Sequence, residues 1–386
     1  MKNRNFVNTL LDRLSEKAPL IQVIVGPRQV GKSTGIKQVL NHQQGVYFTA
    51  DSPVPIHFSE IEALWSDAMQ LEKPVLAIDE IQKISGWSEI IKKLWDTREK
   101  PIYLMLSGSA ALAIEKKLKE SLAGRYELIR AEHWNFSEAQ DVFSMSVKDF
   151  IEYGCYPGAQ AFKKDLDRWG LYVRDSIIEP AISRDLLQLQ PVEQPALLRQ
   201  LFSVCVGHPS QIVSLNKIQG QLQDKKSLAT LQNYLELLSH GFLVTGLQKF
   251  SQNAVRTKSS PPKLIIHDNS LIRCFEKPIQ QDIPNTRLGF YLENAVGARL
   301  IESGWDTFYW KDRKLEVDFI TIGPLNQKWA IEVKTSKPKK EDLIGLFTFC
   351  ELNPEFTPCV ACLEEVRIDG IKYLSIDELL KMNRKS

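Results

Sequence analysis

The pattern of apolar and polar positions predicts three kinds of region along the chain. In the first, short apolar runs such as residues 21–25 and 75–78 end in polar residues and alternate with helical patterns, which is typical of an α/β fold. From Leu197 onward, short amphipathic helices are followed by two strand-type runs. A helical pattern over 287–305 and strand-type runs over 307–323 and 327–337 then predict a second α/β region.

Composition restricts the class of protein. Of the 386 residues, 43% are hydrophobic and 25% are charged, so a folded chain of two or three domains is expected. The first twenty residues lack the apolar stretch of a signal peptide, and no run approaches the length of a membrane span, which favours a cytoplasmic location. Because the net charge is only +2, any nucleic-acid surface has to be local.

The cysteines and histidines show no spacing typical of a metal site. Six scattered cysteines are expected to be reduced. Cys359 and Cys362 form one C-x-x-C, but no second ligand pair accompanies them, and their apolar flanks favour a buried strand. The six histidines form no readable site, so packing and surface hydrogen bonding are their expected roles.

The clearest chemistry lies in GPRQVGKST, which follows a strand pattern and begins a helical one. Its glycines allow backbone conformations in which consecutive N–H groups point at a phosphate. Lys32 is expected to reach the β and γ phosphates of ATP, and the Ser33 hydroxyl to bind Mg²⁺. The residues expected to contact ATP in this loop are Gly26, Pro27, Arg28, Gln29, Val30, Gly31, Lys32, Ser33 and Thr34.

An acidic pair follows the next buried strand pattern, in KPVLAIDEIQKI. This is the arrangement of a Walker B motif. Asp79 would hold Mg²⁺ through water, and Glu80 would polarise the attacking water as a general base.

Two further elements of the nucleotide site follow along the chain. The run PIYLMLSGSA ends in Ser107 and Ser109, and either serine could sense the γ-phosphate. Arg125, in LAGRY, could act on the nucleotide of a neighbouring subunit as an arginine finger, or form a structural ion pair.

Five segments together resemble one family: GPRQVGKST, LAIDEIQKISGW, LSGSA, LAGRYELIRAEHWNFSEA and YGCYPGA. They are similar to prokaryotic AAA+ ATPases that carry a C-terminal domain of the PD-(D/E)XK nuclease-like fold. Cys155 departs from the family, which usually has a second glycine there, and the sequence after ISRDLL is less typical. The resemblance covers nearly the whole chain.

The patterns and the resemblance together predict an α/β protein of four parts. These are an AAA+ P-loop ATPase domain over 1–140, a helical lid or linker over 141–195, a winged helix-turn-helix over 196–275 and an α/β PD-(D/E)XK-like domain over 276–386.

The middle part is expected to contain three helices and a hairpin. Ser214 and Ser227 are the expected N-caps of the second and third helices, and Gly241 is expected to end the third in a left-handed conformation. Asn233 and Gln232 would lie on the polar side of a recognition helix. The hairpin would form a basic wing, and its expected DNA-binding residues are Arg256, Lys258 and Lys263. A winged helix can equally pack ATPase subunits together.

The C-terminal part contains the residue types of a nuclease centre. A hairpin would place Asp318 beside Glu332, and alternation along the strand turns Glu332 and Lys334 to the same face. Asp318 and Glu332 would share a divalent cation, Lys334 would assist the attacking water, and Glu293 would act from the preceding helix. The alternative is a set of carboxylates paired structurally with lysine or arginine, in a domain that only binds nucleic acid or a partner.

The sequence therefore predicts an ATP- and Mg²⁺-dependent AAA+ ATPase that acts on DNA as a helicase, translocase or branch-migration motor. An arginine finger acting between subunits implies a homo-oligomer such as a hexamer. Two alternatives remain: an ATP-gated DNA nuclease, and a protein-remodelling or signalling ATPase whose C-terminal domain binds a protein.

Overall fold

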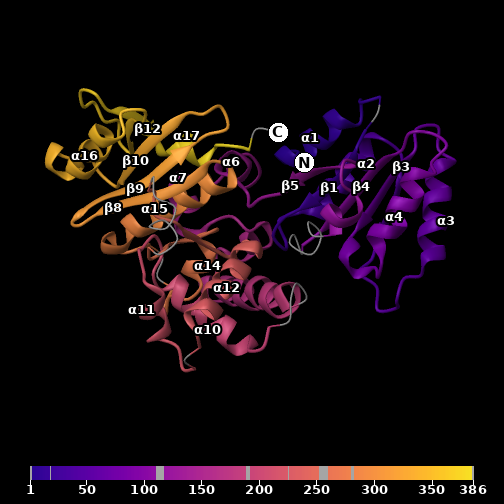
Figure 1. Cartoon of the computed structure of the whole chain (residues 1–386), viewed down its shortest axis with the longest axis horizontal. Helices are drawn as coiled ribbons and strands as arrows, with labels where there is room; N and C mark the ends of the chain where they lie inside the picture. The colour runs from indigo at the N-terminus through magenta and orange to yellow at the C-terminus, as the bar shows by residue number, and fades with distance from the viewer. Residues whose placement is uncertain are drawn as a thin grey trace. The chain divides into compact units, whose positions relative to one another are not determined.

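The computed structural model describes residues 2–17, 19–109, 117–187, 192–224, 226–251, 260–279 and 282–384. They group into two compact units: unit 1 is Met1–Glu132 with Ser183–Pro191, and unit 2 is His133–Ile182 with Val192–Ser386. Each unit contains one five-stranded sheet (Figure 1). Among the described residues, no helix combines the length and apolarity that a membrane span requires. The four-part division remains a prediction.

Unit 1 is built on a parallel sheet, as the alternation of strand and helix patterns predicts. Its strands are β1 (Ile21–Val25), β2 (Val46–Thr49), β3 (Val75–Asp79), β4 (Tyr103–Gly108) and β5 (Tyr126–Arg130), in the order β2-β3-β4-β1-β5. The described helices are α1 (Asn5–Arg13), α2 (Lys32–His42), α3 (Phe58–Met69) and α4 (Trp87–Asp96), with a 3₁₀ turn η1 (Ile81–Lys83). Strands β1, β3 and β4 are buried along their whole length, which explains their continuous apolar runs.

The register of the parallel strands brings the predicted nucleotide residues together. Val25 pairs with Gly108 of β4, and Ile78 of β3 pairs with Leu106 of β4. The phosphate loop after β1, the acidic pair at the end of β3 and the serines of β4 therefore lie at the same edge of the sheet. Ligands of open α/β sheets bind at this carboxyl edge.

Unit 2 begins with a helical part, followed by three helices and a hairpin. The first elements are α6 (Phe136–Phe143), α7 (Val147–Tyr153), η2 (Pro157–Phe162), α8 (Leu166–Tyr172) and two π-helical stretches, η3 (Val173–Ile178) and η4 (Ala181–Leu186). The part of η4 from Ser183 onward groups with unit 1. Then come α10 (Pro195–Val206), α11 (Leu215–Gln219), α12 (Leu228–His240), the antiparallel pair β6 (Val244–Leu247) and β7 (Lys263–Ile266), and α14 (Ser270–Arg273).

The ends of these helices confirm two predicted caps and correct a third position. The side chains of Ser214 and Ser227 accept hydrogen bonds from the third residue beyond them. Gly241, however, has a φ of −82°, and the left-handed residue is Phe242, with a φ of 57°. The Leu243 N–H donates to Leu238 O, which closes the helix one residue later than expected, and the buried Phe242 side chain helps to hold this turn.

The last part of unit 2 is a mixed sheet in the order β12-β11-β10-β9-β8. Its elements are α15 (Asn285–Glu302), β8 (Asp306–Asp312), β9 (Leu315–Ile322), β10 (Lys328–Lys334), η5 (Lys340–Leu343), α16 (Ile344–Leu352), β11 (Thr357–Cys362), β12 (Lys372–Ser375) and α17 (Ile376–Leu380). Helix α15 packs against β7, β8 and β10, whereas α16 packs against β9, β10 and β11. Strand β11 contains Cys359 and Cys362, both buried, as their apolar flanks predict.

Candidate functional site

The loop between β1 and α2 has the backbone conformation of a phosphate-binding loop. Gly31 has a φ of 96°, a conformation that glycine adopts without strain, and Gln29 also has a positive φ, of 60°. A Cβ atom on Gly26 would lie 2.0 Å from Ala131 O, so only glycine allows this close approach to the segment after β5. Both predicted glycines are therefore required by the local backbone.

Two arginines link this loop to other segments of unit 1. The Arg4 guanidinium donates to Val30 O at 2.8 Å and to Glu132 O at 3.0 Å, and so links the loop to the segment after β5. Within the loop itself, Arg28 forms a two-pronged ion pair with Asp185, at 2.6 and 3.1 Å. Sequence reasoning missed Asp185, because nothing local to ISRDLL indicates a partner 157 residues away.

Lys32, the predicted phosphate-binding lysine, is buried and bound to its own loop. Its ammonium donates to Gly26 O at 2.8 Å and to Pro27 O at 2.7 Å. Burial lowers the pKa of Lys32 to about 8, although the carboxylates of Glu80 and Asp79 act in the opposite direction. The lysine therefore holds a positive charge inside the loop, where the phosphates of a nucleotide would lie.

Asp79, at the end of β3, is oriented by hydroxyl groups from both neighbouring strands. The Ser107 hydroxyl donates to Asp79 Oδ1 at 2.5 Å, and the Tyr47 hydroxyl donates to Oδ2 at 3.1 Å. Burial and the negative charge of Asp79 raise the pKa of Tyr47 to about 12, so this phenol remains a donor. Tyr47 was not predicted from sequence, because it lies in an apolar strand and belongs to no motif.

Glu80, the predicted general base, is held in an unusual backbone conformation. Its φ of 56° is uncommon for a residue other than glycine, and its carboxylate accepts a hydrogen bond from Gln82 Nε2 at 2.5 Å. Residues in this region are often found at functional sites. The carboxylate is thus restrained by Gln82 in this state.

The two candidate sensor serines have different surroundings. Ser107 is fully buried and is bound to Asp79. The Ser109 Oγ is buried at the end of β4 without a hydrogen-bond partner among the described residues. Ser107 therefore orients Asp79, whereas the Ser109 hydroxyl has no contact with Asp79 among the described residues.

The side chains at this edge fit a magnesium ion. The hydroxyl of Ser33, at the start of α2, and the carboxylate of Asp79 are hard oxygen donors, which Mg²⁺ prefers. The Ser33 hydroxyl also interacts with Tyr47, which itself contacts Asp79, so the two expected ligands share a neighbour. Thr34 is exposed on the first turn of α2.

Arg125 forms an ion pair within its own subunit. Its guanidinium donates to both carboxylate oxygens of Asp96, at 2.8 and 3.0 Å, and both side chains are partly exposed. This geometry corresponds to the structural ion pair considered from sequence. A role toward a neighbouring subunit would require Arg125 to leave Asp96.

In unit 2, the predicted acidic residues do come together, but around a lysine. Lys263 of β7 is fully buried, and its ammonium lies 2.5 Å from Glu293 Oε1 and 3.3 Å from Asp318 Oδ1. Lys334 pairs with Glu332 at 2.7 Å, which agrees with the expectation that both side chains face the same side of β10. This set of five residues is called the acid–lysine cluster below.

The position of Lys263 corrects the prediction that it binds DNA from an exposed wing. Although burial disfavours a charged ammonium, the carboxylates of Glu293 and Asp318 raise the pKa of Lys263. The acid–lysine cluster contains three carboxylates but only two lysines. Burial and the negative charge of Asp318 therefore raise the pKa of Glu293 and of Glu332 to about 8. Lys263 is an internal counter-charge and is not accessible to a phosphate backbone.

The acid–lysine cluster does not fit a divalent cation as it is arranged. Asp318 Oδ1 faces the Lys263 ammonium, and Asp318 Oδ2 accepts the Val333 N–H at 2.8 Å. Among the described residues, Glu332 Oε2 is buried without a hydrogen-bond partner, whereas the buried Glu293 Oε1 faces the Lys263 ammonium at 2.5 Å. Both oxygens of Asp318 are thus already engaged by the protein itself.

The remaining predicted DNA contacts, Arg256 and Lys258, lie outside the described residues. Among the described residues, exposed cations do occur in the segments that flank β9 and β10. They are Arg313 and Lys314, in the turn between β8 and β9, and Lys337, Lys339 and Lys340, after β10.

Comparison with known families divides the chain into three matched segments. Residues 18–140 match the family described as "AAA domain". Residues 145–281 and 288–379 match two families described only as domains of unknown function, DUF8612 and DUF4143. The first match, together with the parallel sheet and the phosphate loop, supports an AAA-type P-loop ATPase domain in unit 1.

Several related proteins match over most of the chain. An uncharacterized protein of Haemophilus influenzae is 25% identical over 78% of this chain and 79% of its own length. One from Methanocaldococcus jannaschii is 24% identical over 83% of this chain and 76% of its own. One from Mycobacterium tuberculosis is 27% identical over 68% of this chain, but over only 57% of its own length.

Solved structures give more distant likenesses. The Walker-type ATPase PABY2304 of Pyrococcus abyssi is 16% identical, with a TM-score of 0.47 over 71% of this chain and 95% of its own. The Holliday junction branch migration motor RuvB of Thermotoga maritima is 15% identical, with a TM-score of 0.33 over 63% of this chain and 88% of its own.

Proposed function

We propose that this protein is an Mg²⁺-dependent ATPase whose reaction takes place at the carboxyl edge of the unit 1 sheet. The observation that carries the proposal is the position of Lys32. Its ammonium is enclosed by the glycine loop, where it donates to the carbonyls of Gly26 and Pro27. A buried cation beside a helix N-terminus and a glycine-rich loop favours a bound polyphosphate.

Each group at this edge has a role in hydrolysis. Lys32 and the loop N–H groups bind the β and γ phosphates and offset the charge that develops as the γ-phosphate leaves. Mg²⁺, held by Ser33 and Asp79, would neutralise phosphate charge. Glu80 accepts the proton of the attacking water once its carboxylate leaves Gln82, and Ser109 donates to the γ-phosphate.

The experiment that tests the proposal is a measurement of ATP hydrolysis by the full chain and by Lys32→Ala. Hydrolysis is expected to fall to background in the variant, because the phosphates lose their buried counter-charge. The matched control is Lys73→Ala, which removes an exposed lysine of the same unit and is expected to retain the wild-type rate. A Lys32→Ala protein that hydrolyses ATP at the wild-type rate would overturn the proposal.

A second variant separates binding from chemistry. Glu80→Gln keeps the size of the side chain but removes the base, so ATP binding is expected to persist while turnover is lost. Loss of binding instead would assign Glu80 a different role.

The proposed target of the ATPase is DNA, with hydrolysis driving translocation, branch migration or strand separation by a homo-oligomer. Exposed lysines at positions 337, 339 and 340 support a phosphate-binding surface on unit 2. The test is the ATPase rate with single-stranded, double-stranded and four-way-junction DNA. Stimulation by one of these supports DNA as the partner and identifies its shape. Rates that are indifferent to every DNA favour a protein-remodelling or signalling ATPase.

The ATP-gated nuclease has less support than the DNA motor. A nuclease of this type requires Asp318 and Glu332 to share a cation, and the Lys263 ammonium lies against Asp318. The acid–lysine cluster is better explained as a structural element that fixes β7 against α15 and β9.

A further inference from the structure

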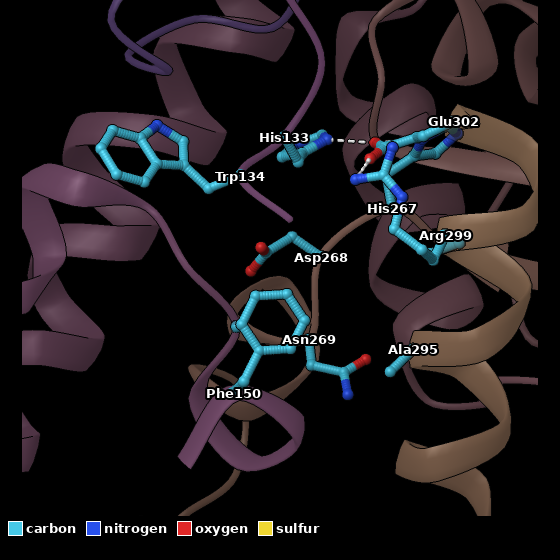
Figure 2. Close-up of a pocket in the computed structure, with 11 residues that line it drawn as sticks. His133, Trp134, Phe150, His267, Asp268, Asn269, Ala295, Arg299 and Glu302 are labelled. Atoms are coloured by element: carbon cyan, nitrogen blue, oxygen red, sulfur yellow. Dashed lines mark hydrogen bonds and ion pairs between the residues drawn. The ribbon is translucent and has the colours of Figure 1, made fainter. Parts of the chain in front are cut away.

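Three buried side chains from distant parts of the sequence meet in unit 2. His133 lies in the segment after β5, His267 directly follows β7, and Glu302 is the last residue of α15. Figure 2 shows both imidazole rings directed at the Glu302 carboxylate. All three side chains are almost completely buried, with exposures of 3%, 7% and 5%.

The two rings approach the carboxylate through equivalent atoms. His133 Nδ1 lies 2.5 Å from Glu302 Oε1, and His267 Nδ1 lies 3.2 Å from the same oxygen. The three candidate ligand atoms all lie within 4.8 Å of one another. Two imidazole nitrogens and one carboxylate oxygen thus converge on one small volume.

The opposite nitrogens of both rings are fixed by hydroxyl groups. His133 Nε2 lies 2.8 Å from the Tyr156 hydroxyl, and His267 Nε2 lies 2.8 Å from Thr245 Oγ1. Histidine ligands of metals characteristically have the outer nitrogen held in this way, which sets the tautomer and the ring orientation. With Nε2 of each ring held by a hydroxyl, Nδ1 is the nitrogen that faces Glu302, and a metal would take the place of the proton through which Nδ1 contacts this carboxylate.

The second oxygen of Glu302 is also engaged. Arg299 NH1 lies 3.6 Å from Glu302 Oε2, and this guanidinium is itself buried. The arginine therefore holds one carboxylate oxygen and leaves Oε1 to face the two imidazoles. The carboxylate would bind a metal through this single oxygen.

A small cavity adjoins the three side chains. It has a volume of about 20 Å³, and its lining also includes Trp134, Phe150 and Asp268. A water molecule needs roughly 10–15 Å³ of such space. This volume is sufficient for one water as a fourth ligand.

We propose that His133, His267 and Glu302 bind one Zn²⁺ through Nδ1, Nδ1 and Oε1, with a water as fourth ligand. Two imidazoles and one carboxylate suit zinc, a cation of intermediate softness, and tetrahedral bonds of about 2.0–2.2 Å require His133 Nδ1 to move outward from Glu302 Oε1. When Zn²⁺ binds, the protons between the two Nδ1 atoms and Glu302 Oε1 are released to water. Because its three ligands are buried and come from separate segments, the ion would join the segment after β5 to the residue after β7 and to α15.

The test is the zinc content of the full chain, measured by elemental analysis after gel filtration in metal-free buffer. One zinc per chain is expected in the wild type, and removal with a strong chelator is expected to lower the thermal midpoint, which added Zn²⁺ restores. The matched control is His42→Gln, which removes an exposed histidine and is expected to keep the zinc. The Glu302→Gln variant is expected to lose the zinc, because it lacks the carboxylate ligand.

A second measurement covers the case in which Glu302→Gln fails to fold. Tyr156→Phe keeps all three ligands and removes only the hydroxyl that holds His133, and is expected to weaken zinc binding by about 10–100-fold. Co²⁺ added to the chelated wild type is expected to give the visible absorption of a tetrahedral nitrogen–oxygen site. The alternative is a metal-free hydrogen-bond network around Glu302. The proposal would be overturned if the wild-type protein contained no zinc, if added Zn²⁺ did not change its thermal midpoint, and if added Co²⁺ gave no such spectrum. These results together would establish the metal-free network.

Discussion

The Lys263 ammonium lies 2.5 Å from Glu293 Oε1, in a position that no solvent reaches. It joins β7 to α15 through charge, and Asp318 of β9 takes part at 3.3 Å. A buried charge that loses its partner is strongly unfavourable, whereas the intact pair contributes little net stability. The stability of unit 2 is therefore expected to depend on Lys263.

Lys263→Met replaces the ammonium by an apolar group of similar length and leaves the carboxylates without their counter-charge. We expect the variant to lose about 3–5 kcal/mol of unfolding free energy. The measurement is urea denaturation of the full chain. Lys337→Met, at an exposed position, is the control and is expected to change stability by less than about 0.5 kcal/mol. Coincident transitions for wild type and Lys263→Met would contradict the role assigned to Lys263.

The same arrangement predicts that the wild-type protein does not cut DNA. Supercoiled plasmid incubated with the protein, ATP and either Mg²⁺ or Mn²⁺ is expected to remain supercoiled on a gel, because Lys263 and Val333 engage the oxygens of Asp318. The same plasmid assay with the Lys334→Ala variant provides the comparison. Cutting by the wild type that disappears in Lys334→Ala would restore the nuclease interpretation.

The two serines of β4 are expected to affect different steps of ATP hydrolysis. Ser107→Ala removes the donor to Asp79 and is expected to raise the Mg²⁺ concentration needed for half-maximal activity by about 10–100-fold. Ser109→Ala removes a donor to the γ-phosphate and is expected to lower kcat at saturating Mg²⁺ by about 10–100-fold.

Steady-state rates over a range of Mg²⁺ concentrations separate these two effects. Ser66→Ala, exposed on α3, provides the unaffected reference. Identical Mg²⁺ profiles for Ser107→Ala and Ser109→Ala would show that the two serines are not distinct in function.

Asp185 places a negative charge beside the phosphate loop, where it pairs with Arg28 and acts on Lys32. Asp185→Asn removes that charge and frees Arg28 to contact an anionic phosphate. ATP affinity is expected to rise by about 1 kcal/mol, roughly fivefold. The measurement is titration with a fluorescent ATP analogue, with the exposed Asp67→Asn as control. Weaker binding would indicate that the ion pair holds the loop in its binding conformation.

Arg125 and Asp96 form an exposed ion pair, which contributes little to stability. If Arg125 acts on a neighbouring subunit's nucleotide, Arg125→Ala is expected to lower kcat by about 10³-fold or more while ATP binding persists. Asp96→Ala breaks the same ion pair and leaves the arginine, so it is expected to remain active. Equal activities of the two variants would assign Arg125 a purely structural role.

The sequence was sufficient to predict the elements of unit 1, because the relevant signals are local. The loop glycines, the buried strand that ends in Asp79 and the strand that contains Ser107 are each encoded within about ten residues, and parallel pairing then brings them to one edge. The capping serines 214 and 227 were predictable for the same reason.

The errors and omissions concern contacts between distant segments. Lys263 appeared to belong to an exposed basic arm, because its partners are Glu293 and Asp318, 30 and 55 residues away. Tyr47 and Asp185 belong to no motif, and the meeting of His133 with Glu302 spans 169 residues. A pattern of residue types along a chain does not contain these pairings.

The order β2-β3-β4-β1-β5 has a consequence for synthesis on the ribosome. Among the described strands, β1 pairs with β4 and β5, so its apolar residues have no sheet partner until β4 is complete at Gly108, and they are paired on both sides only once the chain has grown past Arg130. At usual translation rates, about 100 residues correspond to roughly 5–20 s during which this segment is exposed. The emerging polypeptide is therefore expected to recruit a chaperone in that interval and to release it once β5 closes the sheet.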